Sequence, residues 1–260
     1  MSDAEWAVVW DAMPVPAWLE GRGRQPEGYC HRRLVDAVRY LVSTGITWRA
    51  MPVDFPAWER VDAFFRRWRG KGLVGEFHDR LRDRGREAAG RDSEPTAGII
   101  DSQSVKAAAS VAASSRGFDR GKKVNGRKRH IVADALGLLL TVLVTAACVT
   151  DREAGRTLLA RLPQQHWRIT LVWADGGCTG CLLDFARDAW RIALTVVRRN
   201  DDAAGFTVLP KRWLVERMFA WLMRSRRLAR DYEARTDTSE AMIRWSMSMV
   251  MSRRLARREH

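Results

Sequence analysis

Three acidic residues stand at positions from which their carboxylates could act on one substrate. Asp101 interrupts an apolar segment at 97–105 that is typical of a strand. Asp175 follows a second apolar segment, 169–174, and Glu216 lies in a segment with helical periodicity. Because functional sites in open α/β sheets collect at the ends of strands, we expect these acids to converge there.

Converging carboxylates suit the cleavage of a phosphodiester bond. An anionic backbone repels a nucleophile and an alkoxide is a poor leaving group, so the reaction in water is slow. Two Mg²⁺ ions roughly 3.5–4 Å apart overcome both obstacles, because one activates water for in-line attack and the other stabilises the leaving oxygen. Mg²⁺ prefers oxygen ligands and keeps several waters, so two or three carboxylates are enough to hold it.

Glu216 has a second interpretation. At about 100° per residue, Leu214 and Met218 belong to an apolar stripe, and Glu216 faces away from it. Glu216 shares its face with Arg212, one turn before it. An exposed Arg–Glu pair of this kind stabilises a helix by roughly a few tenths of a kcal/mol and carries no function. The residues alone leave both interpretations open.

The elements that position these residues alternate between strands and helices. β-branched residues and leucines predict the strands, and Asp151 is expected to cap the helix that begins beside it. The predicted strands are 97–105, 131–133, 138–144, 169–174 and 192–197, and the predicted helices are 151–162, a segment ending near Trp190, and 211–230. This order predicts an α/β fold, with a mixed sheet flanked by helices.

The N-terminal part of the chain reads as helical. One apolar pattern with helical spacing begins at Leu34, and a second runs from Trp58 to Trp68. Two short helices joined by a glycine-containing segment suggest a helix-turn-helix that binds DNA, with Arg66 and Arg67 beside the polar face of the second helix. A simple helical bundle has the same pattern and is the alternative.

Composition and charge narrow the class of protein. The chain has 260 residues, and 45 Lys and Arg against 31 Asp and Glu give a net charge of +14. Its apolar content of 46% excludes a wholly disordered chain. No apolar stretch reaches the roughly 20 residues that cross a bilayer, and the first residues lack a signal-peptide pattern, so we expect a soluble intracellular protein. The excess positive charge favours a polyanionic partner such as nucleic acid.

The charged segment that ends near Pro95 predicts a domain boundary. The predicted organisation is a helical domain at 1–94, an α/β domain at 95–235 and a helical basic tail at 236–260. Within the α/β domain, residues 106–128 are expected to form a strongly basic loop. Its charge density favours contact with phosphate groups, and a merely solvated loop is the alternative.

A set of short segments occurs along the chain in a fixed order. They are Gly45–Arg49, Trp58–Trp68, Ile99–Lys106, Gly121–Val132, Trp173–Gly177, Arg212–Leu222 and Arg226–Glu233. With these segments the chain resembles the DDE transposases of the insertion sequence five family, which are bacterial members of the ribonuclease H-like superfamily. The resemblance covers nearly the whole chain.

The resemblance implies a ribonuclease H-like mixed sheet flanked by helices, with an N-terminal helical DNA-binding domain. It implies that Asp101, Asp175 and Glu216 are the catalytic DDE triad and the ligands of two Mg²⁺ ions, for which Mn²⁺ substitutes. The implied activity is a transposase that binds terminal inverted repeats of an insertion sequence, cleaves DNA strands and transfers them into target DNA. Leu209 and Met223 stand where some relatives have Tyr and Lys, so those two roles are not carried over.

The residues expected to contact DNA are basic. Arg212 matches a family residue four positions before the Glu, which could contact a phosphate of a transposon end. The whole expected set is Arg66, Arg67, Lys122, Lys123, Arg127, Lys128, Arg129, Arg212 and Arg227.

The expected partners are double-stranded DNA, as transposon ends and as target, and further copies of the chain. Cutting two ends requires two active sites, which predicts a homodimer or a larger synaptic complex on DNA. No membrane partner is expected, and the expected location is the bacterial cytoplasm, at the nucleoid. Two alternatives stay open: a domesticated or decayed transposase that only binds DNA, and a nuclease of the same fold that does not transfer strands.

Overall fold

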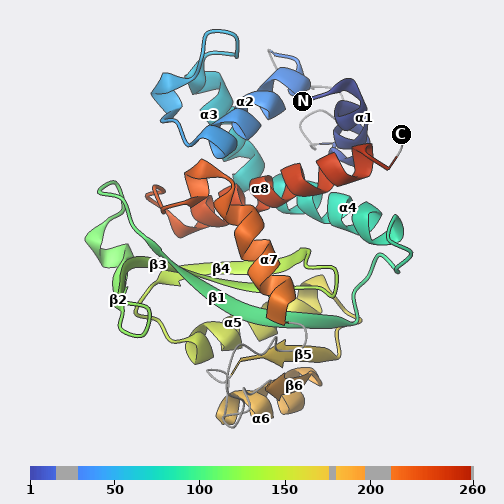
Figure 1. The fold of residues 1–260 in the computed structure, drawn as a ribbon, viewed down its shortest axis with the longest axis vertical. Helices are drawn as coiled ribbons and strands as arrows, with labels where there is room; N and C mark the ends of the chain where they lie inside the picture. Colours follow the sequence, from blue (N-terminus) through green and yellow to red (C-terminus); the bar gives the residue numbers. More distant parts are fainter. Residues whose placement is uncertain (16–28, 176–179, 197–211, 259–260) are drawn as a thin grey trace. The chain divides into compact units, whose positions relative to one another are not determined.

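The computed structural model describes residues 1–15, 29–175, 180–196 and 212–258 (Figure 1). The chain forms two compact units, and each combines segments that lie far apart in the sequence. The first unit comprises Met1–Arg91, Leu222–Ala229 and Ala241–His260, and the second comprises Asp92–Trp221 and Arg230–Glu240. The domain boundaries expected after residues 94 and 235 stay predictions.

The second unit is built on a mixed sheet, in which the strand order is β2-β3-β1-β5-β6 and β4 also pairs with β3. The strands are β1 (Ala97–Lys106), β2 (Gly117–Asp119), β3 (Val124–Ala133), β4 (Leu139–Ala146), β5 (Leu171–Ala174) and β6 (Ala193–Val196). β1, β3 and β4 are antiparallel neighbours. β5 and β6 continue the sheet in parallel with β1 (Figure 1).

Helices flank this sheet. α5 (Asp151–Gln165) contacts β1, β3, β4 and α6 (Cys181–Trp190). The apolar core between them includes Ile100 of β1, Val132 of β3 and Leu158 of α5. α7 (Arg212–Met223) contacts the turn between β3 and β4, where Arg217 Nη2 donates to the Leu136 carbonyl oxygen at 2.8 Å. The predicted mixed sheet flanked by helices is confirmed.

The start of α5 differs from the sequence-based expectation. Thr150, rather than Asp151, is its N-cap residue. The Thr150 hydroxyl accepts from the Glu153 backbone N–H at 3.2 Å, and the Glu153 carboxylate accepts from the Thr150 N–H at 3.0 Å. This reciprocal pair is a capping box. The Asp151 carboxylate is therefore left to make other contacts.

The basic segment before β3 also differs from the expectation. Residues 106–128 are not one loop, because they include β2 and the first residues of β3, which begins at Val124. Gly126 makes this close pairing with β1 possible, since a Cβ there would lie 2.0 Å from the Val105 carbonyl oxygen. Arg127 is buried, and its guanidinium donates to the Glu233 carbonyl oxygen at 2.7 Å and to Asp231 at 3.2 Å. A buried arginine persists because such acceptors replace the water it loses.

The first unit is helical, as predicted. Its helices are α1 (Asp3–Ala12), α2 (His31–Thr44), α3 (Trp58–Gly70), α4 (Leu73–Glu87) and, from Ala241 onwards, α8 (Thr236–Ala256), with short 3₁₀ turns at Trp48–Ala50 and Arg226–Leu228. Three buried aromatic rings form the centre of the core. Trp68 of α3 stacks on Trp245 of α8 at 6.0 Å between ring centroids, and Phe77 of α4 lies 5.5 Å from Trp245.

The connection between α2 and α3 occupies residues 45–57. A compact helix-turn-helix has a turn of roughly three to four residues, so this pair of helices departs from that geometry. The DNA-binding role of the first unit stays a prediction. No helix in the described part of the chain is both long and apolar enough to cross a membrane.

Candidate active site

Asp101, in the middle of β1, and Asp175, directly after β5, lie next to each other in the sheet. In the parallel pair of β1 and β5, Ile99 stands opposite Trp173. Each of these residues is followed two positions later by an aspartate, so continuing the register places Asp101 beside Asp175. Both side chains are half-buried and line one pocket.

The pocket is lined by Ile100, Asp101, Ser102, His130, Asp151 and Asp175. It contains three carboxylates, from β1, from the residue after β5 and from the first turn of α5. The backbone N–H of Ser102 donates to Asp101 Oδ1 at 2.7 Å, which fixes one oxygen of that carboxylate. The two glycines after Asp175 lie outside the described residues.

Asp151 is held by two basic side chains of β3. Its Oδ1 lies 3.4 Å from His130 Nδ1 and 3.5 Å from Lys128 Nζ. Partial burial alone would raise the pKa of Asp151, but hydrogen bonds from His130 and Ser102 and the charge of Lys128 hold it well below its usual range. Burial lowers the pKa of His130, although the neighbouring Asp151 acts in the opposite direction.

Sequence reasoning missed Asp151 and His130 as residues of this site. Asp151 was expected only as a helix cap, and the Thr150-x-x-Glu153 pattern is the signal that assigns that role to Thr150 instead. His130 belongs to the face of β3 that also carries Lys128, since side chains two residues apart point the same way along a strand.

Lys122 stands beside the pocket. Its Nζ donates to the carbonyl oxygen of Ser102 at 2.8 Å, while the side chain remains exposed. The turn that carries it is fixed by Asp119, whose Oδ1 accepts from the backbone N–H groups of Gly121 and Lys122, each at 3.0 Å. Burial raises the pKa of Asp119, but hydrogen bonds from Ser104 and Lys122 and the charge of Lys128 lower it to about 2. An exposed ammonium is thus tethered next to three carboxylates.

Glu216 is not among the residues that line the pocket. It lies on the exposed face of α7, whereas Leu214, Val215 and Met218 of the same helix are buried. The neighbouring Arg217 lies over the ring of Trp213, with its guanidinium carbon 4.5 Å from the ring centroid. The structure therefore brings together two of the three expected acids.

The residues expected to contact DNA divide into two groups. Arg66, Arg67, Lys122 and Lys123 are exposed. Arg127, Lys128, Arg129 and Arg227 are buried. The side chain of Arg212 lies outside what the structure describes.

The buried group does not support the expectation of phosphate contact. Arg227 Nη1 donates to the Ile46 carbonyl oxygen at 2.8 Å, and Lys128 Nζ donates to that of Val149 at 3.1 Å. Burial lowers the pKa of Arg129 to about 10. Side chains enclosed in this way do not reach a DNA phosphate in this conformation. The density of charge in a sequence does not distinguish buried from exposed cations, so the burial of these residues was not predicted.

The chemistry of the pocket fits a hard divalent cation. Asp101 and Asp175 offer carboxylate oxygens, which Mg²⁺ prefers, and this ion completes its coordination with water. Within the described residues, no group of three or more His, Cys, Asp or Glu side chains is placed to hold a metal ion directly. Asp101 and Asp175 are the two carboxylates of the expected triad that this pocket brings together.

Comparisons with known proteins identify the family of the chain. Residues 92–251 match the family model described as "Transposase DDE domain", a span that contains Asp101, Asp175 and Glu216. Residues 1–78 match the family model described as "Putative transposase of IS4/5 family".

Among individual proteins, the chain is similar to a "Putative transposase for insertion sequence element IS402" from Burkholderia cepacia. The two are 31% identical over 133 residues, which cover 48% of this chain and 62% of that relative. The match thus spans less than two thirds of the relative's length. Among solved structures, the chain is similar to a piggyBac transposase in a synaptic complex with hairpin DNA, with 12% identity, a TM-score of 0.39, and coverage of 76% of this chain and 48% of that one.

Proposed function

The chain belongs to the transposase DDE domain family, and we propose that it is a DNA transposase of an insertion sequence. It binds the terminal inverted repeats of the element, cleaves DNA strands at its ends and transfers them into target DNA. One observation carries the proposal: within the matched domain, Asp101 in the middle of β1 and Asp175 directly after β5 line one pocket.

DDE transposases use divalent metal ions, and we propose Mg²⁺ here, with Mn²⁺ as a substitute. Asp101 and Asp175 would hold the ions. When bound, the ions supply activation of the attacking oxygen and stabilisation of the leaving oxygen. In the first reaction, water attacks the phosphorus, the bond to the 3′ oxygen breaks, and that oxygen takes up a proton. In the second, the freed 3′ hydroxyl loses its proton and attacks a phosphodiester bond of the target, whose own 3′ oxygen leaves.

Residues of the chain contribute orientation and charge to both reactions. The Ser102 N–H orients the Asp101 carboxylate. Lys122 offers an exposed ammonium next to the pocket, where it neutralises a phosphate adjacent to the reacting one. Such contacts position the DNA without reading its sequence.

We propose Glu216 as the third acid of the catalytic triad because it lies within the matched domain. It is exposed on α7 and does not line the pocket. A Glu216→Gln variant therefore tests this part separately from the two aspartates.

The proposed partners are the transposon ends, the target DNA and at least one further copy of the chain. Arg66, Arg67, Lys122 and Lys123 are the exposed candidates for phosphate contact, and Arg212 is a candidate by its sequence position alone. Two ends must be cut together, which favours a homodimer or larger synaptic complex that acts on DNA at the nucleoid of a bacterial cell.

A cleavage and joining assay tests the proposal. The full chain is incubated with Mg²⁺, a target plasmid and duplexes taken from the DNA that flanks its gene. We expect nicked ends and joined products with the wild-type chain, and neither product with Asp101→Asn or Glu216→Gln. The control is Asp188→Asn, which removes an exposed carboxylate of α6 that pairs with Arg187. This variant should form both products. End binding without cleavage in Mg²⁺ or Mn²⁺ would contradict catalysis, and nicking without joined products would indicate a nuclease.

A further inference from the structure

A third carboxylate shares the pocket with Asp101 and Asp175. We propose that Asp151 helps to bind the divalent cation of this pocket, acting through water molecules that the cation retains. The inference rests on the proposed function, because it assumes that the two aspartates hold such an ion. Neither the family match nor the sequence pattern assigns this role to Asp151.

The place of Asp151 in α5 makes its carboxylate available. Thr150 and Glu153 satisfy the backbone N–H groups at this helix end through their capping box, so Asp151 does not cap the helix. As the first residue of α5, it stands where the helix dipole favours a negative charge. Its side chain is half-buried, at 31% exposure, and lines the pocket.

The orientation of Asp151 is fixed from β3. Lys128 and His130 both approach its Oδ1, and the opposite ring nitrogen of His130, Nε2, lies 3.0 Å from Thr145 Oγ1 on β4. The carboxylate thus contacts β3 directly, and one of its two partners there is itself held by β4. A ligand held in this way needs little ordering when an ion binds.

Asp151 is more than the counter-ion of Lys128. Lys128 Nζ also lies 3.4 Å from Asp119 Oδ2, so a second carboxylate balances its charge. The six residues that line the pocket include three carboxylates and neither Lys nor Arg. Lys122 and Lys128 stand beside the pocket, and a divalent cation would balance the negative charge that remains.

Among the described residues, no three His, Cys, Asp or Glu side chains are placed to bind a metal ion directly. We therefore assign Asp151 to the waters of the ion rather than to the ion itself. Mg²⁺ dehydrates reluctantly and keeps several waters, whose O–H groups can donate to the oxygens of an outer carboxylate. Asp151 is accordingly a positioning residue. Removing an outer partner of a metal site typically lowers metal affinity about 10- to 100-fold.

Binding of Mn²⁺ to the full chain, without DNA, tests the inference directly. Free Mn²⁺ is followed by its electron paramagnetic resonance signal, and Mg²⁺ is then added as a competitor. We expect the dissociation constants of both ions to rise about 10- to 100-fold in Asp151→Asn. Asp188→Asn removes the same charge on α6 and should leave both constants within about twofold of wild type.

A purely structural role for Asp151 predicts a different result. In that case Asp151→Asn lowers the thermal unfolding midpoint without metal, and the dissociation constants stay at their wild-type values, which overturns the inference. If Asp151→Asn does not fold, Asp151→Glu decides, because it keeps the charge beside Lys128 and His130 but displaces the carboxylate. Weaker Mn²⁺ binding by Asp151→Glu supports the inference, and unchanged binding overturns it.

The inference and the proposed function fail in different ways. A wild-type chain that neither binds Mn²⁺ nor cleaves end DNA contradicts the proposed function. A wild-type chain that does both, and loses both in Asp101→Asn but neither in Asp151→Asn, contradicts only the role of Asp151.

Discussion

Asp101 and Asp175 stand at the same level of two adjacent parallel strands, each two residues beyond the facing pair Ile99 and Trp173. The backbone register of β1 and β5 therefore sets how close their carboxylates lie. Two like charges at this spacing repel each other in the absence of a cation, and a bound divalent ion removes that repulsion.

Removal of divalent metal should separate binding from catalysis. With EDTA in place of Mg²⁺, we expect end cleavage to fall to background while end binding persists, because basic side chains contact phosphates without metal. Gel-shift and cleavage assays on the same duplex measure the two activities. Cleavage that continues in EDTA would contradict the role assigned to Asp101 and Asp175.

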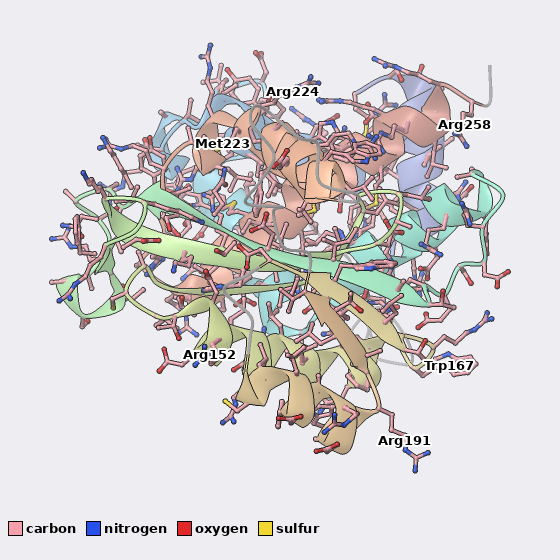
Figure 2. The ribbon with its side chains drawn as sticks, turned by 60° about the horizontal axis from the view of Figure 1, so that its bottom comes forward. Arg152, Trp167, Arg191, Met223, Arg224 and Arg258 are labelled. Atoms are coloured by element: carbon pink, nitrogen blue, oxygen red, sulfur yellow. The ribbon has the colours of Figure 1, made fainter. Side chains whose placement is uncertain are left out.

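Lys122→Gln should weaken DNA binding about equally for end and unrelated sequences, since a phosphate contact carries no sequence information. The slope of log affinity against log salt should become shallower by about one. Arg191→Gln is the matched control, because Arg191 follows α6 and projects into solvent (Figure 2). An unchanged salt slope in Lys122→Gln would exclude the proposed contact.

Arg127→Ala should lower the free energy of unfolding by about 3–5 kcal/mol, because it leaves Asp231 buried without its cation. Denaturant unfolding followed by circular dichroism measures the loss. Arg152→Ala, at an arginine exposed on α5 (Figure 2), should change stability by no more than about 0.5 kcal/mol. Equal effects of the two substitutions would show that Arg127 is not a buried ion-pair residue.

Asp119 should make the second unit acid-sensitive. Its pKa is about 2 in the folded chain, against about 3.9 when unfolded, so its stabilisation is complete above pH 4. It is lost as the pH falls from about 4 to about 2. Asp119→Asn should lower the thermal midpoint at pH 7 by a few degrees. Its midpoint should also depend less on pH than wild type between pH 4 and 2, and parallel pH curves for the two proteins would refute this.

Trp68→Ala should destabilise the first unit by about 3–5 kcal/mol, since Trp68 is completely buried against Phe64, Phe77 and Trp245. Trp167→Ala removes a tryptophan that is 78% exposed and projects from the surface (Figure 2), and should have little effect. Chemical denaturation monitored by the remaining tryptophan fluorescence compares the two. A loss below about 1 kcal/mol for Trp68→Ala would contradict its place in the core.

Local pattern predicted much of the fold and part of the site. Asp101 within one predicted strand and Asp175 at the end of another were expected to converge, because sites in an α/β sheet collect at strand ends. The burial of Arg127 could not be predicted, because its partner Asp231 lies 104 residues further along the chain. Charge density alone predicts exposure for such a residue. Asp151 was within reach of local reasoning, since the Thr150 and Glu153 spacing already assigns the cap elsewhere.

The first unit combines segments from both ends of the chain, and this affects when it can fold during synthesis. Ribosomes deliver a protein from its N-terminus, and domains generally fold as they emerge. All segments of the second unit are present once Glu240 has been synthesised, whereas Trp68 of the first unit acquires its partner Trp245 only later. The helices that are synthesised first thus complete their core only after Trp245 has been synthesised, and a ribosome that stalls before Trp245 leaves them without it.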